Sequence, residues 1–201
     1  CLNSELSSEI TLQPITRFNL DSAIIFSDIL MVPYALGQKV EFIKDMGPKL
    51  EEFNFKFFTE NNKKYFTQKL QPVYEAIRQT RNKLDKEKSL IAFVGAPWTL
   101  LIYMLGLKLD KKKIDYQKIT SKKDEISSIL NKLNEYLSIH IENQINAGAD
   151  VIQIFDSWAG LIKPEDFINY CIEPNFKLVK FCKEKSIPVI CFPKGIGENY
   201  K

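Results

Sequence analysis

The stretch Val151-Ile152-Gln153-Ile154-Phe155-Asp156 decides the fold of this 201-residue chain. It is short and largely apolar, it follows the turn residues Ala147-Gly148-Ala149-Asp150, and it ends in a carboxylate. An apolar run of this length between turn signals is typical of a buried strand in a parallel sheet. The stretch therefore predicts a parallel strand over residues 151–155.

Three more runs have the same character and alternate with helical patterns. They predict strands at 23–28, 90–95 and 188–192. The helical patterns cover Ser4–Phe18, Thr67–Lys83, Asp124–Asn146 and Pro164–Lys185, with a kink expected at Pro174. Strands that alternate with helices form βαβ units, whose right-handed crossovers lead to a parallel sheet or barrel.

The number of strands limits the architecture. A complete (β/α)₈ TIM barrel needs eight strands and roughly 250 residues. We therefore predict an α/β chain that is a partial (β/α)₈ barrel, with about four of the eight βα units in one domain, 1–201. Two segments fall outside this pattern. Val32–Phe66, with a short strand at Lys39–Ile43, is expected to be a loop insertion above the strand ends, and Lys108–Lys123 a solvated connection.

Composition and charge exclude several classes of protein. The chain is 45% hydrophobic and carries a net charge of only +3, with three arginines among its 28 basic residues, which argues against a nucleic-acid partner. Its longest apolar run, near Leu100–Leu105, is far below the ~18 residues of a membrane span, so we expect no membrane partner and a cytoplasmic location. The cysteines are scattered without a CxxC pair, so reduced thiols and no metal are expected. Cys1 at the first position favours a truncated chain over a processed lipoprotein.

Candidate functional residues follow the predicted strands, because functional groups in parallel α/β proteins gather at the carboxyl edge of the sheet. The segments concerned are Ser27–Asp28, Pro97–Tyr103, Asp156–Trp158 and Lys194–Gly197. We expect Asp28, Tyr103 and Ser157 to face one cleft there.

Each candidate has a structural alternative. Asp28 either caps a short helix and accepts loop amides, or faces a cationic or N–H-rich ligand. Tyr103 is either a core residue or a residue at the mouth of the pocket. Ser157 has no adjacent base and lies outside a G-x-S-x-G turn, so it is expected to donate a hydrogen bond to substrate rather than act as a nucleophile. Trp98 and His140 are expected in the core, and the glycines at 195 and 197 form only a weak anion-binding signal.

Four motifs carry a family resemblance. They are Glu9-Ile10-Thr11-Leu12-Gln13-Pro14-Ile15, Ala23-Ile24-Ile25-Phe26-Ser27-Asp28-Ile29-Leu30, Phe93-Val94-Gly95-Ala96-Pro97-Trp98-Thr99-Leu100 and Phe155-Asp156-Ser157-Trp158-Ala159-Gly160. In this order and spacing the chain resembles the uroporphyrinogen decarboxylases. The resemblance implies a (β/α)₈ barrel that decarboxylates the four acetate side chains of uroporphyrinogen III to give coproporphyrinogen III, a step of haem biosynthesis, without a metal or organic cofactor.

The resemblance also implies roles for particular residues. Asp28 would be catalytic and would accept hydrogen bonds from the pyrrole N–H groups of the tetrapyrrole substrate. Tyr103 and Ser157 would bind the substrate, Phe93 and Phe155 would line its pocket, and the full-length enzyme would be a homodimer.

The chain departs from the family in extent. The family's substrate-binding arginines and a further histidine belong to segments outside these 201 residues, and Arg17, Arg78 and Arg81 do not match those positions. We therefore expect the chain alone to be inactive. Two alternatives remain: a zinc-dependent methyltransferase of corrinoid or thiol partners, although Val189 stands where its histidine would precede Cys191, and a lysine-rich binding module without enzymatic activity.

Overall fold

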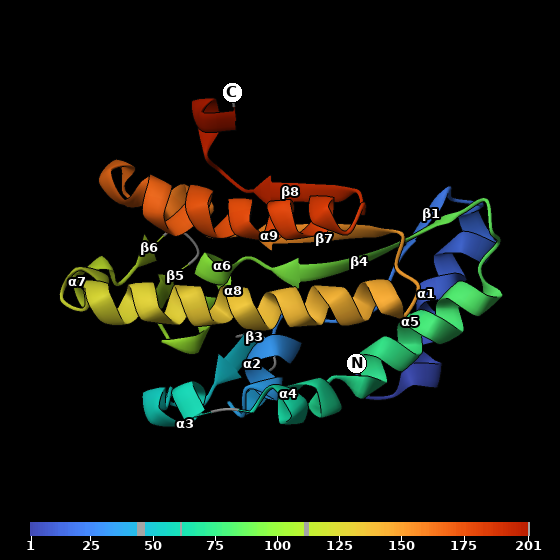
Figure 1. Cartoon of the computed structure of the whole chain (residues 1–201), viewed down its shortest axis with the longest axis horizontal. Coiled ribbons are helices and arrows are strands. Elements are labelled where there is room, and N and C mark those ends of the chain that lie inside the picture. The colour runs from blue at the N-terminus through green and yellow to red at the C-terminus, as the bar shows by residue number, and fades with distance from the viewer. Residues whose placement is uncertain (44–46, 61, 111–112, 201) are drawn as a thin grey trace.

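The computed structural model describes residues 1–43, 47–60, 62–110 and 113–200. Within these residues the main sheet has four strands, all parallel, in the order β1-β4-β7-β8 (Figure 1). Their bounds are Ser22–Ile24 (β1), Ser89–Gly95 (β4), Val151–Asp156 (β7) and Val189–Pro193 (β8). The predicted α/β class and parallel sheet are confirmed.

The first strand is shorter than predicted. The sequence indicated 23–28, but β1 ends at Ile24, and Ile25 makes one further hydrogen bond to Ile91 of β4. The next amide, that of Phe26, donates instead to Thr11 Oγ1 of the first helix at 2.8 Å. The Thr11 hydroxyl thus satisfies the first amide after the pairing of β1 with β4 has ended.

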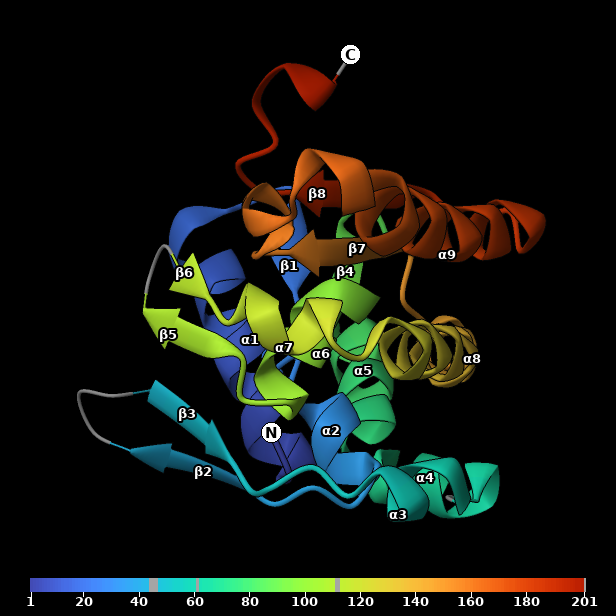
Figure 2. The ribbon, with the colours of Figure 1, turned by 90° about the vertical axis from the view of Figure 1, so that its left-hand side faces the viewer.

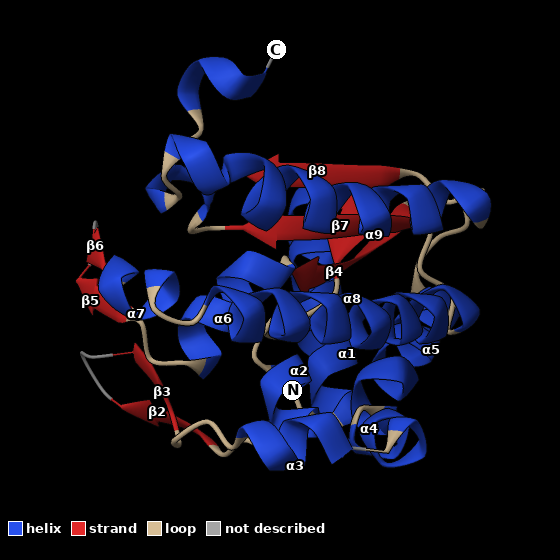
Figure 3. Cartoon of the chain, turned by 60° about the vertical axis from the view of Figure 1, so that its left-hand side comes forward, coloured by secondary structure: helices blue, strands red, loops and turns tan. Residues whose placement is uncertain are grey.

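Long helices cover one face of the sheet. The predicted helix Ser4–Phe18 (α1) is confirmed, and Asn3 caps it by accepting a hydrogen bond from Leu6 N at 2.9 Å. Helix α8, Lys123–Asn146, begins one residue before its predicted start. Helices α8 and α9 (Glu173–Glu184) run along the sheet, and α6 (Pro97–Met104) lies at the end toward which the strands point (Figures 1 and 3).

Prolines divide two of the predicted helices. Thr67–Lys83 is in fact two helices, α4 (Lys63–Lys69) and α5 (Gln71–Lys83), because Pro72 lacks an N–H and begins a new helix in its first turn. The predicted helix Pro164–Lys185 contains a 3₁₀ turn at Pro164–Asp166 (η2) and a π turn at Ile168–Ile172 (η3) before α9. Pro174 lies in the first turn of α9, directly after the π turn, and the kink expected at this proline stays a prediction.

The insertion contains the predicted short strand and several helices. Strand β2 (Val40–Ile43) pairs antiparallel with β3 (Gly47–Leu50), and the short helices α2 (Met31–Ala35) and α3 (Phe55–Glu60) flank this hairpin. A second hairpin projects from the same end of the molecule (Figure 2).

That second hairpin corrects the prediction of a solvated connection at Lys108–Lys123. Strands β5 (Lys108–Asp110) and β6 (Lys113–Ile114) pair, and helix α7 (Tyr116–Thr120) follows. Ile114 and Ile119 are buried, which gives the segment an anchor in the core despite its lysines. Lys111 and Lys112 lie outside the described residues.

The two faces of the sheet differ in burial. Leu90, Ala92, Ile152 and Ile154 are fully buried against the helices. The opposite face carries large apolar side chains that are 45–51% exposed, namely Ile24, Phe26, Ile190 and Phe192. The predicted strands are therefore buried on one face only within the described chain. No helix in the described ranges is long and apolar enough to cross a membrane.

Candidate active site

The carboxyl ends of the four strands meet at one edge of the sheet, where the arrowheads in Figure 1 point the same way. Helix α6 follows β4 there, and the 3₁₀ turns Ala159–Leu161 (η1) and Gly197–Tyr200 (η4) follow β7 and β8. The strand-end segments identified from the sequence therefore lie at the same edge, as the parallel sheet requires.

An aromatic pair lies between the exposed apolar residues of the open sheet face. The rings of Phe93 on β4 and Phe155 on β7 are edge-to-face, with centroids 5.5 Å apart and planes at 75°. Both side chains are half-buried. Phe192 of β8 pairs in register with Phe155, so the apolar surface continues across the neighbouring strand. Such a surface suits the flat ring of an aromatic or heteroaromatic ligand.

Asp28 has the structural role that the sequence left open, while its proposed role toward ligand stays a prediction. Its Oδ1 accepts a hydrogen bond from Leu30 N at 2.8 Å, and α2 begins directly afterwards at Met31. The side chain is half-buried and lines a cavity of about 330 Å³ together with Cys1, Leu2, Leu30, Met31, Tyr34 and Val40. Neither Tyr103 nor Ser157 lines this cavity, so the single cleft expected for the three residues also stays a prediction.

Tyr103 and the residues after β7 do lie together. Tyr103 is half-buried on α6, and its ring is edge-to-face with that of Trp158, with centroids 6.0 Å apart. Lys108 Nζ lies 5.6 Å from the centroid of the same Trp158 ring. Ser157, which precedes Trp158, is exposed to solvent. A phenol and an ammonium group therefore lie against one indole, and the exposed Ser157 is its neighbour in the chain.

The buried carboxylate of Asp156 begins one of the strand-end segments, but the sequence predicts no role of its own for it. It is fully buried, and burial raises its pKa to about 6, while hydrogen bonds from Thr99, Asn175 and Cys171 partly oppose the shift. The sequence contains a signal for this burial. Side chains alternate between the two faces of a strand, so Asp156 lies on the same, buried face of β7 as Ile152 and Ile154.

Other residues weighed from the sequence have structural explanations. His140 is buried and bonds to Tyr74 Oη at 3.0 Å and Gln144 Nε2 at 3.1 Å, and desolvation lowers its pKa to about 3. Trp98 is fully buried. Both were expected in the core, and that prediction is confirmed.

Gly160 after β7 and Gly195 after β8 lie where two backbone segments approach closely, and the weak anion-binding signal at Gly195 and Gly197 stays a prediction. Gly160 N donates to Lys194 O at 3.0 Å, and a Cβ added at Gly160 would lie 2.6 Å from Gly195 O. Gly195 itself has φ +81°, in the left-handed region that favours glycine. The two chain segments that follow β7 and β8 can therefore approach this closely because residue 160 has no Cβ, while glycine at 195 suits the left-handed backbone there.

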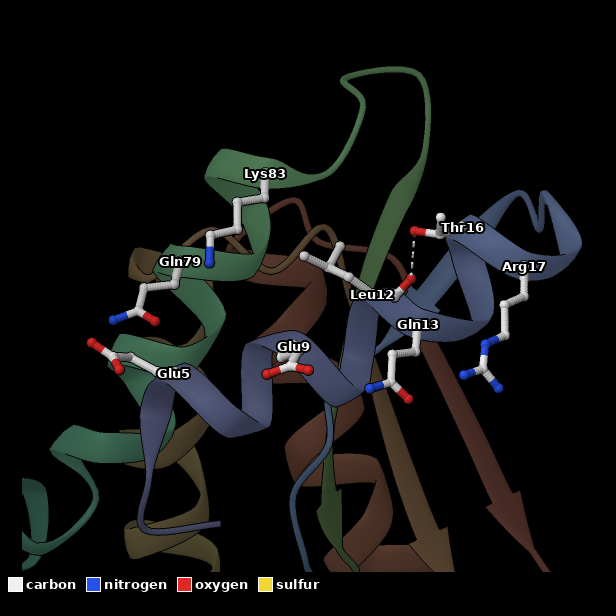
Figure 4. Close-up of a pocket in the computed structure, with 8 residues that line it drawn as sticks. All are labelled: Glu5, Glu9, Leu12, Gln13, Thr16, Arg17, Gln79 and Lys83. Atoms are coloured by element: carbon white, nitrogen blue, oxygen red, sulfur yellow. Dashed lines mark hydrogen bonds between the residues drawn. The ribbon is translucent and has the colours of Figure 1, made fainter.

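A separate cleft of about 650 Å³ lies between α1 and α5 (Figure 4). Arg17 and Lys83 are near the ends of helices that lead into the amino ends of β1 and β4, so the cleft is remote from the carboxyl edge. Its lining residues are mostly polar: Glu5, Glu9, Leu12, Gln13, Thr16, Arg17, Gln79 and Lys83.

Among the described residues, no group of three His, Cys, Asp or Glu side chains could hold a metal ion.

The parallel sheet, with polar and aromatic side chains at its carboxyl edge, defines the chain as a parallel α/β protein, a class whose ligands generally bind at that edge. The family model described as Uroporphyrinogen decarboxylase (URO-D) matches residues 1–200. The chain belongs to the uroporphyrinogen decarboxylase family.

Individual relatives agree with this assignment. Proteins named uroporphyrinogen decarboxylase from Rickettsia bellii and Orientia tsutsugamushi (strain Ikeda) are 42% and 45% identical over the whole chain. The chain spans only 60% and 59% of their lengths. A solved methyltransferase from Methanosarcina mazei has a similar fold, with a TM-score of 0.77, 20% identity, and coverage of 94% of this chain and 56% of the methyltransferase. At that identity the likeness concerns the fold alone.

Proposed function

We propose that residues 1–201 are part of a cytoplasmic carboxy-lyase that removes the four acetate carboxyl groups of uroporphyrinogen III to give coproporphyrinogen III. The observation that carries the proposal is the family match over residues 1–200, together with relatives of this name at 40–45% identity across the chain. The substrate would be a tetrapyrrole, and no metal or organic cofactor is proposed. Homodimer formation by the full-length protein rests on the resemblance alone.

The proposed fold of the full-length protein is a (β/α)₈ barrel, of which residues 1–201 form one domain with about four βα units. Two features support it. Strands β1 and β8 are the edges of the described sheet, and edges of this kind disappear when a barrel closes. A groove of about 640 Å³ also runs beside β1, lined by α1 residues and by residues 20–27. A further parallel strand placed there would cover the groove and pair with the free edge of β1.

The open sheet face would then become the wall of the barrel interior. In this arrangement Phe93 and Phe155 line the substrate pocket, since their edge-to-face pair lies on that face. Tyr103 and Ser157 would bind substrate from the segments that follow β4 and β7. The exposed hydroxyl of Ser157 is free to donate to a substrate carboxylate or pyrrole.

Asp28 is proposed as the catalytic residue. Decarboxylation of a pyrrole acetate begins with protonation of the ring, which makes the ring cationic. The electrons of the C–CO₂ bond then flow toward the ring as CO₂ leaves, and the resulting exocyclic methylene takes up a proton to become a methyl group while the ring loses one. A fixed carboxylate stabilises the cation as it forms. The hydrogen bond from Leu30 N fixes the Asp28 carboxylate through Oδ1, so that Oδ2 would be the oxygen that accepts hydrogen bonds from a ligand.

The experiment uses the full-length protein, meaning residues 1–201 together with the segments that complete the barrel, supplied from the Rickettsia bellii relative where necessary. We expect it to convert uroporphyrinogen III to coproporphyrinogen III in an anaerobic assay with product separation. The unmodified relative is the positive control. A folded full-length protein without this activity, beside an active control, would contradict the proposal.

A further inference from the structure

Helix α6 holds the backbone of residue 158 from both sides. Trp98 Nε1 donates to Trp158 O at 3.1 Å, and Trp158 N donates to Thr99 Oγ1 at 3.3 Å. Trp98 is fully buried and stacks on Tyr170, with ring centroids 5.2 Å apart and planes at 9°. Two consecutive residues of one helix thus fix the peptide groups on either side of Trp158.

The same hydroxyl fixes the residue on the other side of Ser157. Thr99 Oγ1 donates to Asp156 Oδ1 at 2.8 Å, while Asn175 Nδ2 of α9 donates to Asp156 Oδ2 at 3.0 Å. A longer thiol contact of 3.7 Å joins Cys171 Sγ to the same oxygen. Thr99, Asp156 and Asn175 are all buried, with exposed fractions of 0%, 0% and 6%.

The direction of these hydrogen bonds is set by the carboxylate. An ionised carboxylate only accepts, so the Thr99 hydroxyl proton must point toward Asp156 and an oxygen lone pair remains for Trp158 N–H. The amide of Asn175 is oriented in the same way, with its NH₂ group toward Asp156. One buried charge therefore orients both of its neighbours and, through Thr99, the backbone beyond Ser157.

We infer that Thr99, Asp156 and Asn175 form a positioning network that fixes Ser157 relative to Tyr103 for substrate binding. Ser157 lies between two residues that the network holds, and Tyr103 is one helical turn after Thr99 on α6. The positions of both substrate-binding groups therefore depend on the same helix. This inference rests on the proposed function, which assigns Ser157 and Tyr103 to the substrate. The network does not touch the substrate.

The test is a double-mutant cycle in the full-length protein, with Thr99→Val and Ser157→Ala measured singly and together. Valine has the shape of threonine but neither donates nor accepts a hydrogen bond. We expect Thr99→Val to lower kcat/KM about 10- to 100-fold, because misplacement by about 1 Å can reduce a rate by that order. In the Ser157→Ala background the same substitution should produce almost no further loss, because there is no hydroxyl left to position.

Two controls separate positioning from a general structural effect. Thr99→Ser keeps the hydroxyl and should restore most of kcat/KM. Thr80→Val makes the same chemical change at a buried threonine of α5, whose hydroxyl bonds to Ala76 O, and should leave kcat/KM unchanged. If Thr99→Val does not fold, Thr99→Ala, which leaves room for water, takes its place in the cycle.

The outcomes are distinct. Losses that multiply independently in the double variant, or a serine variant as impaired as valine, would overturn the positioning role while leaving the proposed function intact. An unsubstituted full-length protein that folds but lacks decarboxylase activity would overturn the proposed function and this inference with it. Non-additive losses with rescue by serine would support the network.

Discussion

Asp156→Asn should make the protein more stable at neutral pH, by an amount that depends on pH. Burial raises the pKa of Asp156 from 3.8 to about 6 in the folded protein. The shift of roughly two pKa units corresponds to about 3 kcal/mol, since one unit is about 1.4 kcal/mol. The folded state favours the protonated acid, so this stabilisation is complete below pH ~4 and is lost as the pH rises through about 6.

The asparagine side chain carries no such dependence. Its oxygen can accept from Thr99, and its NH₂ group can face Asn175, whose Oδ1 has no partner among the described residues and becomes available when that amide turns over. Cys171 and Cys191, which lie near Asp156, have pKa values raised by burial to about 12 and 11, so they stay protonated in this range.

The assay compares the free energy of urea unfolding of the original protein and Asp156→Asn at intervals from pH 4 to pH 8. Taking the difference between the two cancels all groups that titrate alike in both. We expect the advantage of the asparagine variant to grow by about 2–2.5 kcal/mol between pH 4 and pH 8, because Asp156 of the unfolded chain is already partly ionised at pH 4. Thr99→Val, which removes a donor to the ionised form, should steepen the loss of stability with pH. A difference that is flat with pH would refute the reasoning, because it would mean that Asp156 ionises in the folded protein as easily as in the unfolded chain.

Three further predictions concern catalysis, assembly and the core. In the full-length protein, Asp28→Ala should fold normally and lose about 10²–10³ in kcat in the coproporphyrinogen assay. The kcat of Asp28→Asn should lie between those of the unsubstituted protein and the alanine variant. Near-normal turnover of the alanine variant would exclude the catalytic assignment. Residues 1–201 expressed alone should elute as aggregates in size-exclusion chromatography and lack activity. The reason is that four large apolar side chains are about half exposed on the open sheet face. A monodisperse, active chain would contradict this prediction. Tyr74→Phe should lower the free energy of unfolding by about 1–3 kcal/mol, because it leaves the buried Nδ1 of His140 without its partner at 3.0 Å, and an unchanged urea midpoint would argue against that bond.

The regular elements could be predicted because their signals are local. An apolar run between turn residues is visible in the sequence, and so is the 3.6-residue period of α8, which the structure confirms almost to the residue. Errors occurred where one side chain changed the outcome. β1 ends early and the next amide, that of Phe26, bonds to Thr11, Pro72 divides a helix, and two isoleucines anchor the lysine-rich segment after α6. Each depends on a partner distant in sequence or on a single residue that an averaged pattern does not weigh.

The same distinction between local and long-range signals applies to the candidate site. The strand-end rule correctly places the four segments at one edge of the sheet, since it needs only the positions of the strands. It does not show that Thr99 and Asp156, 57 residues apart, share a hydrogen bond, because that contact depends on how α6 packs against β7. Asp28 shows the converse limit, since its bond to Leu30 is local and was anticipated, whereas any role toward substrate depends on a pocket.

That pocket and the open sheet face are one structural problem. Phe93 and Phe155 meet on the face where Ile24 and Phe192 are about half exposed, so the surface proposed to hold the macrocycle is also the surface with the most unburied apolar area on the sheet. A pyrrole cation is stabilised by a carboxylate only where water is excluded, because water screens the interaction. The strands that close the proposed barrel would therefore do two things at once. They would bury the apolar face, which stabilises the fold, and they would remove water from around Asp28, which makes its charge effective in catalysis.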